Sequence, residues 1–314
     1  MATLVVGSIA LDTVETPFGR AEEALGGTAV YFSLAASLFT TVQMVGVVGE
    51  DFPAEGVELL RSRSIDLSGL QTQTGQTFRW VGEYDYDMNT AHTLDTRLNV
   101  FEMFHPTLPA GYRDARFVFL GNIDPVLQLE VLTQITKPRF TALDTMNFWI
   151  QRKKAELTEV IRHVDAVLIN ETEIREYTGR YNVMRAAEEV QALGPRCVVV
   201  KRGEYGSLMF FDDHISAVPA YPTFDVKDTT GAGDSFAGGF MGYLDTCDDL
   251  DEIEVRRAAV YGTILASFAV EDFSINGLTR ADQDSMTSRY ARLQDLARID
   301  RPAVAGQQLI IEGV

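Results

Sequence analysis

The chain has 314 residues, of which 46% are hydrophobic and 23% charged, and this composition excludes an intrinsically disordered protein. Its 27 basic and 45 acidic residues give a net charge of −18, which disfavours nucleic acid and anionic membranes as partners because both are negatively charged. The two cysteines form no CxxC pair, which excludes a disulfide scaffold and a structural zinc site, and no apolar run approaches the roughly 18 residues of a membrane helix. We therefore expect a single cytoplasmic domain over residues 1–314 that is not exported.

Short apolar runs recur along the chain, with helical patterns between them. Because the runs are continuous, each strand is expected to be covered on both faces, which is typical of a parallel sheet between two layers of helices. After Gly231 the chain is expected to be almost wholly helical, at 234–243, 253–270 and 282–297. The sequence thus predicts an α/β fold with a mostly parallel sheet. The runs expected to form strands are 4–6, 42–48, 117–120, 140–143, 166–169 and 197–200.

One segment breaks this alternation. Residues 71–99 are rich in Thr, Tyr, Phe and Trp with polar residues between them, which predicts antiparallel strands rather than another helix. Residues 13–25 are expected to join them, because they leave the first strand and carry Pro17 and Gly19. A small sheet inserted over the carboxyl ends of the main strands would form a lid.

Aromatic residues of this expected lid alternate like one face of a strand. Packing within the lid, or a homodimer contact through it, is favoured over stacking on a substrate. Stacking on a base would instead favour a nucleoside as the substrate. The residues concerned are Phe78, Trp80, Tyr84 and Tyr86.

The most informative segment is DTTGAGDSFAGGF, at 228–240. Gly231, Ala232 and Gly233 stand just before an expected helix, and the first amide groups of a helix have no partner within it, so they can bind an anion. Asp234 stands at the same helix end, where the N–H donors should keep its carboxylate ionised and ready to accept a proton from a hydroxyl. The segment predicts an anion site beside a base, and the alternative is a glycine-rich turn with an aspartate cap.

Two other phosphate-binding motifs are missing from the sequence. Phe236 stands where the dinucleotide fingerprint needs its third glycine, and the first strand supplies only Gly7, which argues against a dehydrogenase. No GxxxxGK[ST] segment occurs, so phosphoryl transfer by this chain would not use a P-loop.

With these motifs the chain resembles the ribokinase-like, or PfkB-type, carbohydrate kinases. The segment at 228–240 is similar to the carboxyl-terminal signature of that family, and the other motifs follow in family order from residue 4 to about residue 277. The resemblance implies a ribokinase-like three-layer α/β/α fold with a small antiparallel β lid. The further motifs are VVGSIALD ending at Asp12, the pair Gly26-Gly27, the βα segment at 45–66, NETE at 170–173 and KRGEYGS at 201–207.

The resemblance also implies ATP and Mg²⁺ as cofactors and a role for each matching position. Asn170 and Glu173 would organise magnesium and phosphate through water, which suits hard oxygen ligands, while the alternative for this pair is a capping box. Asp228 would hold a potassium ion together with carbonyl groups at 270–277, where Asn276-Gly277 offers a flexible turn, and its alternative is capping the turn before Thr230. The remaining implied residues are Asp234 as the catalytic base, Gly231, Ala232 and Gly233 as the anion hole, Asp12, Gly26 and Gly27 for substrate hydroxyls, and Lys201, Gly203, Gly206 and Thr230 for the nucleotide.

Other polar residues are weaker candidates. Lys201 and Arg202 follow a strand at the carboxyl end, where α/β proteins bind ligands, although a basic pair there can also be a solvated edge. Asp144 and Asn147 follow another strand and would face the phosphates or form an Asx turn. The histidines, none of which has a metal-ligand spacing, are expected to be structural or surface residues: His92, His105, His163 and His214.

The segment after Gly27 departs from the family pattern. Many sugar-kinase relatives carry an asparagine three or four positions on, whereas residues 28–33 contain none, which argues against ribose itself and for a different hydroxylated substrate. A phosphorylated sugar would need a second basic cluster, for which the nearby candidates are scattered: Arg20, Arg79, Arg97 and Arg113.

From these features we expect an ATP-dependent kinase that phosphorylates a primary hydroxyl of a sugar or related polyol. A base of ordinary pKa would suffice, because the proton leaves late in a loose transition state. The alternatives are a nucleoside kinase of the same fold and a non-catalytic relative that senses a sugar or a nucleotide, although the latter has little reason to retain Asp234.

Overall fold

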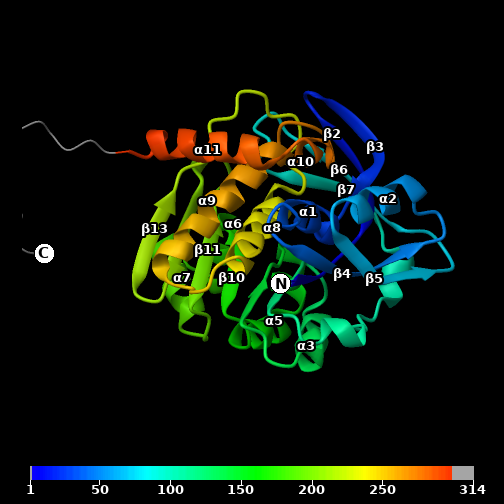
Figure 1. The fold of residues 1–314 in the computed structure, drawn as a ribbon, viewed down its shortest axis with the longest axis horizontal. Helices are drawn as coiled ribbons and strands as arrows, with labels where there is room; N and C mark the ends of the chain where they lie inside the picture. Colours follow the sequence, from blue (N-terminus) through cyan, green and yellow to red (C-terminus); the bar gives the residue numbers. More distant parts are fainter. Residues whose placement is uncertain (1, 299–314) are drawn as a thin grey trace, which may run out of the picture.

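The computed structural model describes residues 2–298. The strands of its large sheet are β1 (Ala2–Val6), β4 (Thr41–Gly49), β5 (Ile65–Gln73), β8 (Phe117–Leu120), β9 (Phe140–Leu143), β10 (Ala166–Asn170), β11 (Cys197–Lys201), β12 (Ser207–Phe211) and β13 (His214–Val218). They are hydrogen-bonded in the order β13-β12-β11-β10-β9-β8-β1-β4-β5 (Figure 1). Between β11 and β5 every neighbouring pair in this order is parallel, which confirms the predicted sheet. The strands β5, β12 and β13 were not predicted, and β12 and β13 add an antiparallel edge.

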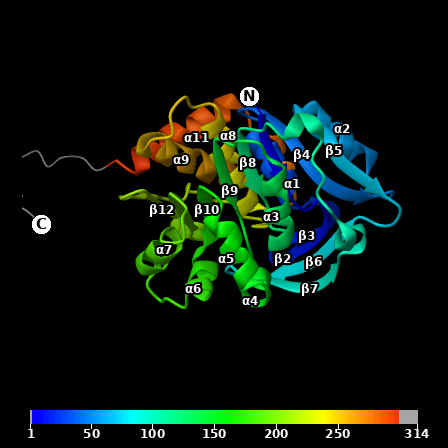
Figure 2. The same ribbon diagram turned by 90° about the horizontal axis from the view of Figure 1, so that it is seen from below.

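Helices cover both faces of this sheet, so the three-layer prediction is confirmed. They are α1 (Thr28–Ala36), α2 (Ala54–Ser62), α3 (Pro125–Gln134), α4 (Asn147–Arg152), α5 (Lys154–Arg162), α6 (Glu171–Thr178), α7 (Val183–Gln191), α8 (Ala232–Asp245), α9 (Glu252–Ala269), α10 (Asn276–Thr279) and α11 (Gln283–Leu296). One layer contains α1 and α8 to α11 and the other contains α3 to α7, while α2 packs beside β5 (Figure 2). The helices predicted after Gly231 correspond to α8, α9 and α11. Within residues 2–298, no helix combines the length and apolar character needed to cross a membrane.

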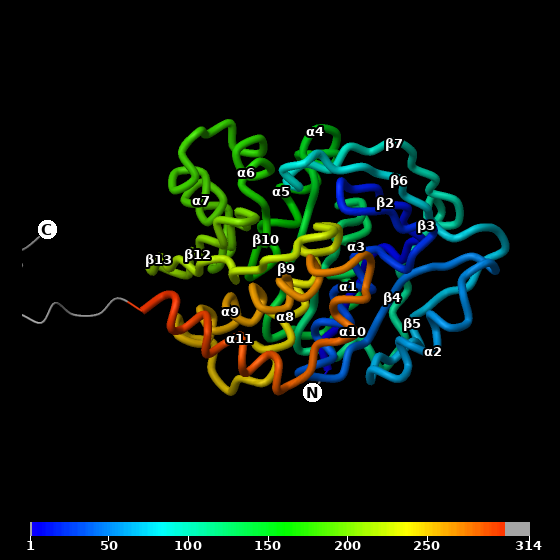
Figure 3. The backbone as a smooth tube through the Cα atoms, turned by 90° about the horizontal axis from the view of Figure 1, so that it is seen from above, coloured from blue at the N-terminus to red at the C-terminus, as the bar shows by residue number. Residues whose placement is uncertain are grey.

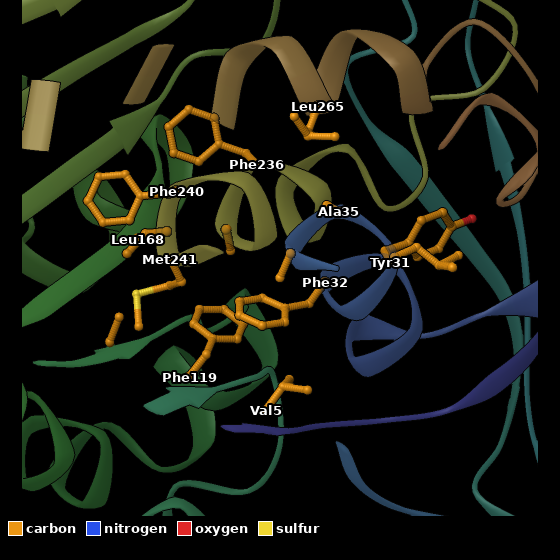
Figure 4. Close-up of a cluster of buried hydrophobic side chains, with 14 of the residues drawn as sticks. Val5, Tyr31, Phe32, Ala35, Phe119, Leu168, Phe236, Phe240, Met241 and Leu265 are labelled. Carbon is orange, nitrogen blue, oxygen red and sulfur yellow. The ribbon is translucent and has the colours of Figure 1, made fainter. Parts of the chain in front are cut away.

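Side chains of each central strand alternate between two hydrophobic cores, one on each face of the sheet. In β1, Val5 packs into the core beneath α1 and α8, whereas Val6 packs into the core beneath α3 and α5. Figure 4 shows the first of these cores, where the rings of Phe32 and Phe119 stack with centroids 4.5 Å apart. Burial on both faces is the physical reason that these strands are continuous apolar runs in the sequence.

A second, four-stranded sheet lies at one end of the molecule (Figure 3), and we call it the lid. Its strands are β2 (Ala10–Thr16), β3 (Gly19–Gly26), β6 (Phe78–Tyr84) and β7 (Ala91–Arg97), in the order β3-β2-β6-β7. The pairs β2–β3 and β6–β7 are antiparallel hairpins, and a parallel pair, β2–β6, joins them. The lid is therefore built from two segments that are distant in the sequence, as predicted.

The bounds of the lid differ from the predicted ones. Residues 71–73 belong to β5 of the large sheet, and the first hairpin begins at Ala10 rather than at residue 13. Asp12 consequently lies in the lid and not at the end of the first strand, because the chain leaves the large sheet after Val6. The aspartate predicted to hold a substrate is thus attached to the lid sheet.

Candidate active site

The glycine-rich segment 228–233 forms a turn that leads into α8. Gly231 is the N-cap residue with φ of +74°, in the left-handed region, and no side chain caps this helix end. A Cβ on Gly231 would lie 2.4 Å from the ring of Tyr31, so only glycine fits there. The amide of Ala232 donates to the carbonyl of Thr229 at 3.2 Å, so it is already engaged and, contrary to prediction, is not an open anion-hole donor. The other first-turn amides have no partner within the helix.

The later glycines of the motif allow close helix packing rather than chemistry. A Cβ on Gly238 would lie 2.3 Å from the carbonyl oxygen of Phe32 in α1, and one on Gly239 would lie 2.8 Å from the carbonyl oxygen of Tyr261 in α9. These close approaches allow α8 to pack tightly against α1 on one side and α9 on the other. Gly238 and Gly239 therefore help to position the start of α8, where Gly231 and Asp234 lie.

Asp234 lies in the first turn of α8 with its carboxylate surrounded by protein. Burial, together with repulsion from Asp144, raises the pKa of Asp234 from 3.8 to about 7, while Lys201 and a hydrogen bond from the Thr28 side chain act in the opposite direction. The pKa is thus higher than the ordinary value that would suffice for such a base, because the desolvation of the carboxylate outweighs its favourable neighbours. Such a group is poised to accept a proton near neutral pH.

Lys201, at the end of β11, lies at the same helix terminus. Its ammonium nitrogen would be 3.0 Å from a Cβ on Gly233, and it donates to Asp144 Oδ2 at 3.1 Å. Burial lowers the pKa of Lys201, but the attraction of Asp144, Glu173 and Asp234 outweighs it and keeps the lysine protonated. One ammonium therefore faces three carboxylates, an excess of negative charge.

Asn170 and Glu173 form the capping box that was the structural alternative for NETE. The Glu173 amide donates to Asn170 Oδ1 at 2.8 Å, and the Asn170 amide donates to Glu173 Oε2 at 2.9 Å. Burial and repulsion from Asp144 raise the pKa of Glu173, even though it also faces Lys201. The cap thus fixes this carboxylate close to Lys201 and Asp144.

Asp12 and the glycine pair form a second group beside Asp234. A Cβ on Gly26 would lie 2.0 Å from Asp12 Oδ2, so the glycine makes room for this carboxylate. Gly27, with φ of +91°, is the N-cap of α1, and its amide donates to Asp12. Burial and the charges of Asp228 and Asp234 raise the pKa of Asp12 to about 7.

Asp228 connects the motif to the loop after α9. Its Oδ1 accepts from the amide of Thr230 at 2.8 Å, which is the capping role considered for it, and its Oδ2 accepts from the amide of Ser274 at 3.3 Å. Burial raises the pKa of Asp228. The predicted flexible turn at Asn276-Gly277 is wrong: both residues lie in α10, and a Cβ on Gly277 would strike the carbonyl of Phe268.

The lid contacts the motif directly. The hydroxyl of Thr230 donates to Tyr84 Oη at 3.1 Å, and the hydroxyl of Thr229 donates to the carbonyl of Met88 at 2.9 Å. The other hairpin of the lid also contacts this segment: the hydroxyl of Thr16, the last residue of β2, donates to the carbonyl of Lys227 at 2.8 Å. The turn of the β6–β7 hairpin is thus attached to the segment that precedes α8.

Several predicted residues lie outside this group. Gly203 and Gly206 form the turn after β11, where positive φ values of 54° and 82° require glycine. Arg202 pairs with Glu171 at 2.6 Å. Asn147 donates to Glu176 at the surface, so it does not face the helix terminus.

The histidines and the scattered arginines also lie elsewhere. Three histidines pair with surface carboxylates, as expected of surface residues: His92 with Asp85, His163 with Glu159 and His214 with Glu252. His105 contributes its carbonyl to a hydrogen bond from Gln71. Arg79 and Arg97 are opposite each other in the β6–β7 hairpin, and each of them, like Arg20, pairs with an acidic side chain.

Thr28 and Tyr31 were missed in the sequence as site residues, and Tyr84 was named there only as an aromatic residue of the lid. Thr28 follows the glycine pair and interacts with Asp234. Tyr31 stands four positions after Gly27, where relatives carry asparagine, and its ring packs against Gly231; Figure 4 shows its hydroxyl pointing away from the labelled core residues. The signal that could have identified Thr28 and Tyr31 was their position just after the paired glycines. Tyr84 had no such signal, because its contact depends on how the lid folds over the motif.

Together these elements place an anion-binding helix end, a lysine and a carboxylate of raised pKa around one point. Such a set can hold a phosphoryl group and deprotonate a hydroxyl that attacks it. Two further carboxylates, Asp144 and Glu173, lie beside the lysine. Among residues 2–298, no group of three or more His, Cys, Asp or Glu side chains is arranged to hold a metal ion by itself.

Comparisons with known proteins agree with this geometry. A model of the pfkB family carbohydrate kinases matches residues 7–278. The cytidine kinase of Thermococcus kodakarensis is 32% identical over 244 residues, covering 76% of this chain and 86% of the relative. The inositol 3-kinase of Arabidopsis thaliana is 25% identical over 276 residues, covering 85% and 73%. The crystal structure of the nucleoside kinase of Methanocaldococcus jannaschii, a ribokinase-family member, has a TM-score of 0.74 at 21% identity, covering 93% and 99%, which shows a shared fold.

Proposed function

The chain belongs to the pfkB family of carbohydrate kinases, and we propose that it transfers the γ-phosphoryl group of ATP to a primary hydroxyl of a sugar, a polyol or the ribose of a nucleoside. The observation that carries the proposal is the half-buried Asp234 carboxylate in the first turn of α8, which faces Lys201 and has a pKa of about 7.

Each site residue has a distinct part in this reaction. Asp12 orients the substrate through its hydroxyls, and Asp234 accepts the proton of the attacking hydroxyl. The first-turn amides at Gly231 and Gly233 stabilise the charge of the transferring phosphoryl group. Lys201 adds positive charge at the same point, where the removal of water strengthens its effect. Positioning supplies most of the catalysis, because the transition state is loose.

The residues beside Lys201 suit a bound Mg²⁺–ATP. Mg²⁺ is usually held by one or two carboxylates, waters and the phosphates of a nucleotide, and Asp144 and Glu173 are buried carboxylates in an excess of negative charge. These two residues would hold the ion through water, and the ion would neutralise phosphate charge. Glu173 is kept in place for this by its capping box with Asn170.

Among the substrate classes we favour the nucleoside. The cytidine kinase relative is 32% identical to this chain, whereas the inositol 3-kinase relative is 25% identical. The pairing of Arg20, Arg79 and Arg97 with acidic side chains leaves no basic cluster for a phosphorylated sugar. A sensor without activity is disfavoured because Asp234 and Lys201 are both in place.

The test is an assay of ADP release with ATP, Mg²⁺ and a panel of free sugars, acyclic polyols and nucleosides, with inositol, which has only secondary hydroxyls, as the negative control. We expect one class to give saturable turnover and a product phosphorylated on the primary hydroxyl, which NMR of the product identifies. Absence of substrate-dependent ADP release across the panel would contradict the proposal.

The pH dependence of catalysis should reflect the raised pKa values of Asp12 and Asp234, the two carboxyl groups proposed to act on the substrate. Asp12 and Asp234 must both be ionised in the free enzyme, and each has a pKa of about 7. At saturating ATP we expect log(kcat/KM) to be flat above about pH 8 and to fall on acidification below 7, with a slope between one and two. In Asp12→Asn the slope should be close to one. A profile that stays flat down to pH 5.5 would show that neither group titrates there.

Lid closure is tested by hydrogen exchange. The contacts of Tyr84 and Met88 with the motif are few, so we expect amides of β6 and β7 to exchange readily in the free enzyme and to be protected when substrate binds. Tyr84→Phe removes one contact and should increase exchange in the free enzyme, whereas Tyr86→Phe, at an exposed position, should not. Equal protection with and without substrate would indicate a fixed structural role for the lid.

A potassium ion beside Asp228 is a further part of the proposal. Its support is the buried carboxylate that joins the motif to the loop at Ser274, so a cation there would act on the amides of α8. Activity in potassium, sodium and tetramethylammonium at equal ionic strength tests it. Indifference to the cation in both wild type and Asp228→Ala would leave the capping of Thr230 as the role of Asp228. A homodimer formed through the lid stays a prediction. Measurement of the molecular mass in solution would test it.

A further inference from the structure

Trp80 lies on the face of the lid that carries Asp12. The two residues are directly opposite each other in the parallel pair β2–β6, and neighbouring strands are about 4.8 Å apart with paired side chains on the same face. This face turns toward the segment that precedes α8, because Tyr84, four residues further along β6 and so on the same face, accepts a hydrogen bond from Thr230. The side chain of Trp80 therefore leaves the lid on the same face as the carboxylate proposed to hold the substrate hydroxyls, and its indole extends from there toward β7.

The indole of Trp80 lies over Gly82, two residues further along its own strand. A Cβ on Gly82 would lie 2.2 Å from the ring, so the ring occupies the space above this glycine. Across the sheet, Thr93 lies opposite Gly82 in β7, and its hydroxyl accepts a hydrogen bond from Trp80 Nε1 at 3.1 Å. A side chain at position 82 would lift the ring away. One ring face is thus supported by the lid, and the other is turned away from the sheet.

The other aromatic residues of the lid are engaged with protein partners. Phe78 stacks on Phe101 with centroids 5.3 Å apart, and Tyr84 accepts from Thr230. Phe18 and Tyr86 pair at 6.3 Å. Within residues 2–298, Trp80 takes part in no ring–ring or cation–ring pair, and it remains partly exposed. Its outer face is the aromatic surface of the lid that the protein itself leaves uncovered beside Asp12.

We propose that Trp80 is the stacking platform for the planar base of a nucleoside whose ribose hydroxyls are held by Asp12. The inference rests on the proposed transfer of a phosphoryl group to a sugar hydroxyl. A flat ring that is fixed by Gly82 and Thr93 loses little freedom when a base stacks on it, and stacking is tolerant of base identity because every base has a π-face. Trp80 then selects a sugar that carries a base over a free sugar.

The kinetic test compares nucleosides with a free sugar. Trp80→Leu should raise KM for cytidine or inosine by roughly 10-fold to 100-fold, the range expected for the loss of one base–aromatic stack. It should leave kcat/KM for ribose or a polyol within about 3-fold, since those substrates present no base to stack. Trp80→Phe keeps an aromatic ring and should change KM for nucleosides by only a few fold. Equal losses for nucleosides and free sugars in Trp80→Leu would overturn the inference.

Fluorescence gives a readout that does not depend on turnover. The chain has two tryptophans, so Trp149→Phe leaves Trp80 as the only indole and Trp80→Phe leaves Trp149. Trp149 is on α4, where its Nε1 donates to Asn122. Titration with cytidine should quench the emission of Trp149→Phe, because a stacked base quenches the indole, and titration with ribose should not.

The outcomes separate this inference from the proposed function. Turnover with a free sugar, together with unchanged emission of Trp149→Phe in cytidine and inosine, would overturn the stacking role while the kinase proposal stands. Quenching without ADP release from any compound would support nucleoside binding and contradict the proposed transfer.

Discussion

Replacing Asp234 with asparagine is expected to lower turnover by about 10²-fold to 10⁴-fold, the scale of general-base loss. Asparagine keeps the size of the side chain and much of its hydrogen bonding, but it cannot accept the proton of the attacking hydroxyl. Nucleotide binding should persist, because the amides of α8 and Lys201 are unchanged. The measurement is steady-state kinetics beside a nucleotide-binding titration, and turnover near that of wild type would remove Asp234 from the proposed role.

The same helix offers a matched control in Asp245, at its other end. Asp245 is buried and accepts hydrogen bonds from Thr3 and Thr40, so its replacement by asparagine perturbs packing without touching the site. Asp245→Asn should keep kcat close to wild type for the folded fraction of the protein. A comparable loss of kcat in both variants would mean that the effect of Asp234→Asn is structural.

Stability should change in the opposite sense to activity. A carboxyl whose pKa rises from 3.8 in the unfolded chain to about 7 in the folded protein makes folding bind a proton between those values, so this group destabilises the protein as pH rises. Asp234→Asn should therefore be more stable than wild type, by a margin that grows up to about 1.4 kcal/mol per pH unit between about pH 4 and 7 and then levels off. Urea denaturation at pH 5 and pH 8 measures this margin, and an inactive variant that is more stable cannot be inactive through misfolding.

Replacing Gly231 with alanine is expected to lower kcat by about 10²-fold, the cost of losing an oxyanion-type donor. The Cβ would lie 2.4 Å from the ring of Tyr31, and the backbone at φ of +74° disfavours any side chain. Either the turn or α1 must shift, and the first-turn amides then no longer converge on the phosphoryl group. Kinetics at saturating ATP and substrate measure the loss.

Replacing Gly179, the C-cap of α6, is a control that distinguishes the clash with Tyr31 from the strain of a left-handed backbone. Its φ is +70°, close to that of Gly231, but a Cβ there would meet nothing within 4 Å. Gly179→Ala should lose stability through strain of about 1 kcal/mol and keep its kcat. If Gly231→Ala kept its turnover as well, the proposed anion hole would not depend on this turn.

The sequence by itself determined the fold class and the glycine-rich turn at which α8 begins. Strands such as 117–120 and 140–143 were located because burial on both faces requires continuous apolar runs, a local property that any chain of this class must display. Gly231 and Asp234 were identified for a similar reason: a left-handed N-cap and an uncapped helix end need particular residues at fixed spacing. The structure has both strands, and the start of α8, where the sequence predicts them.

Only the tertiary structure decided the properties that depend on distant neighbours. The N–H donors at the helix end were expected to keep Asp234 ionised, whereas its pKa is about 7, because the surrounding protein removes water and Asp144 adds repulsion, and both come from other parts of the chain. Asp12 was expected at the end of the first strand and lies in the lid, because β2 pairs with β6, for example Asp12 with Trp80, and this pairing defines that sheet. The contact of Tyr84 with Thr230 and the place of Trp80 beside Asp12 follow from the same pairing, which no local pattern encodes.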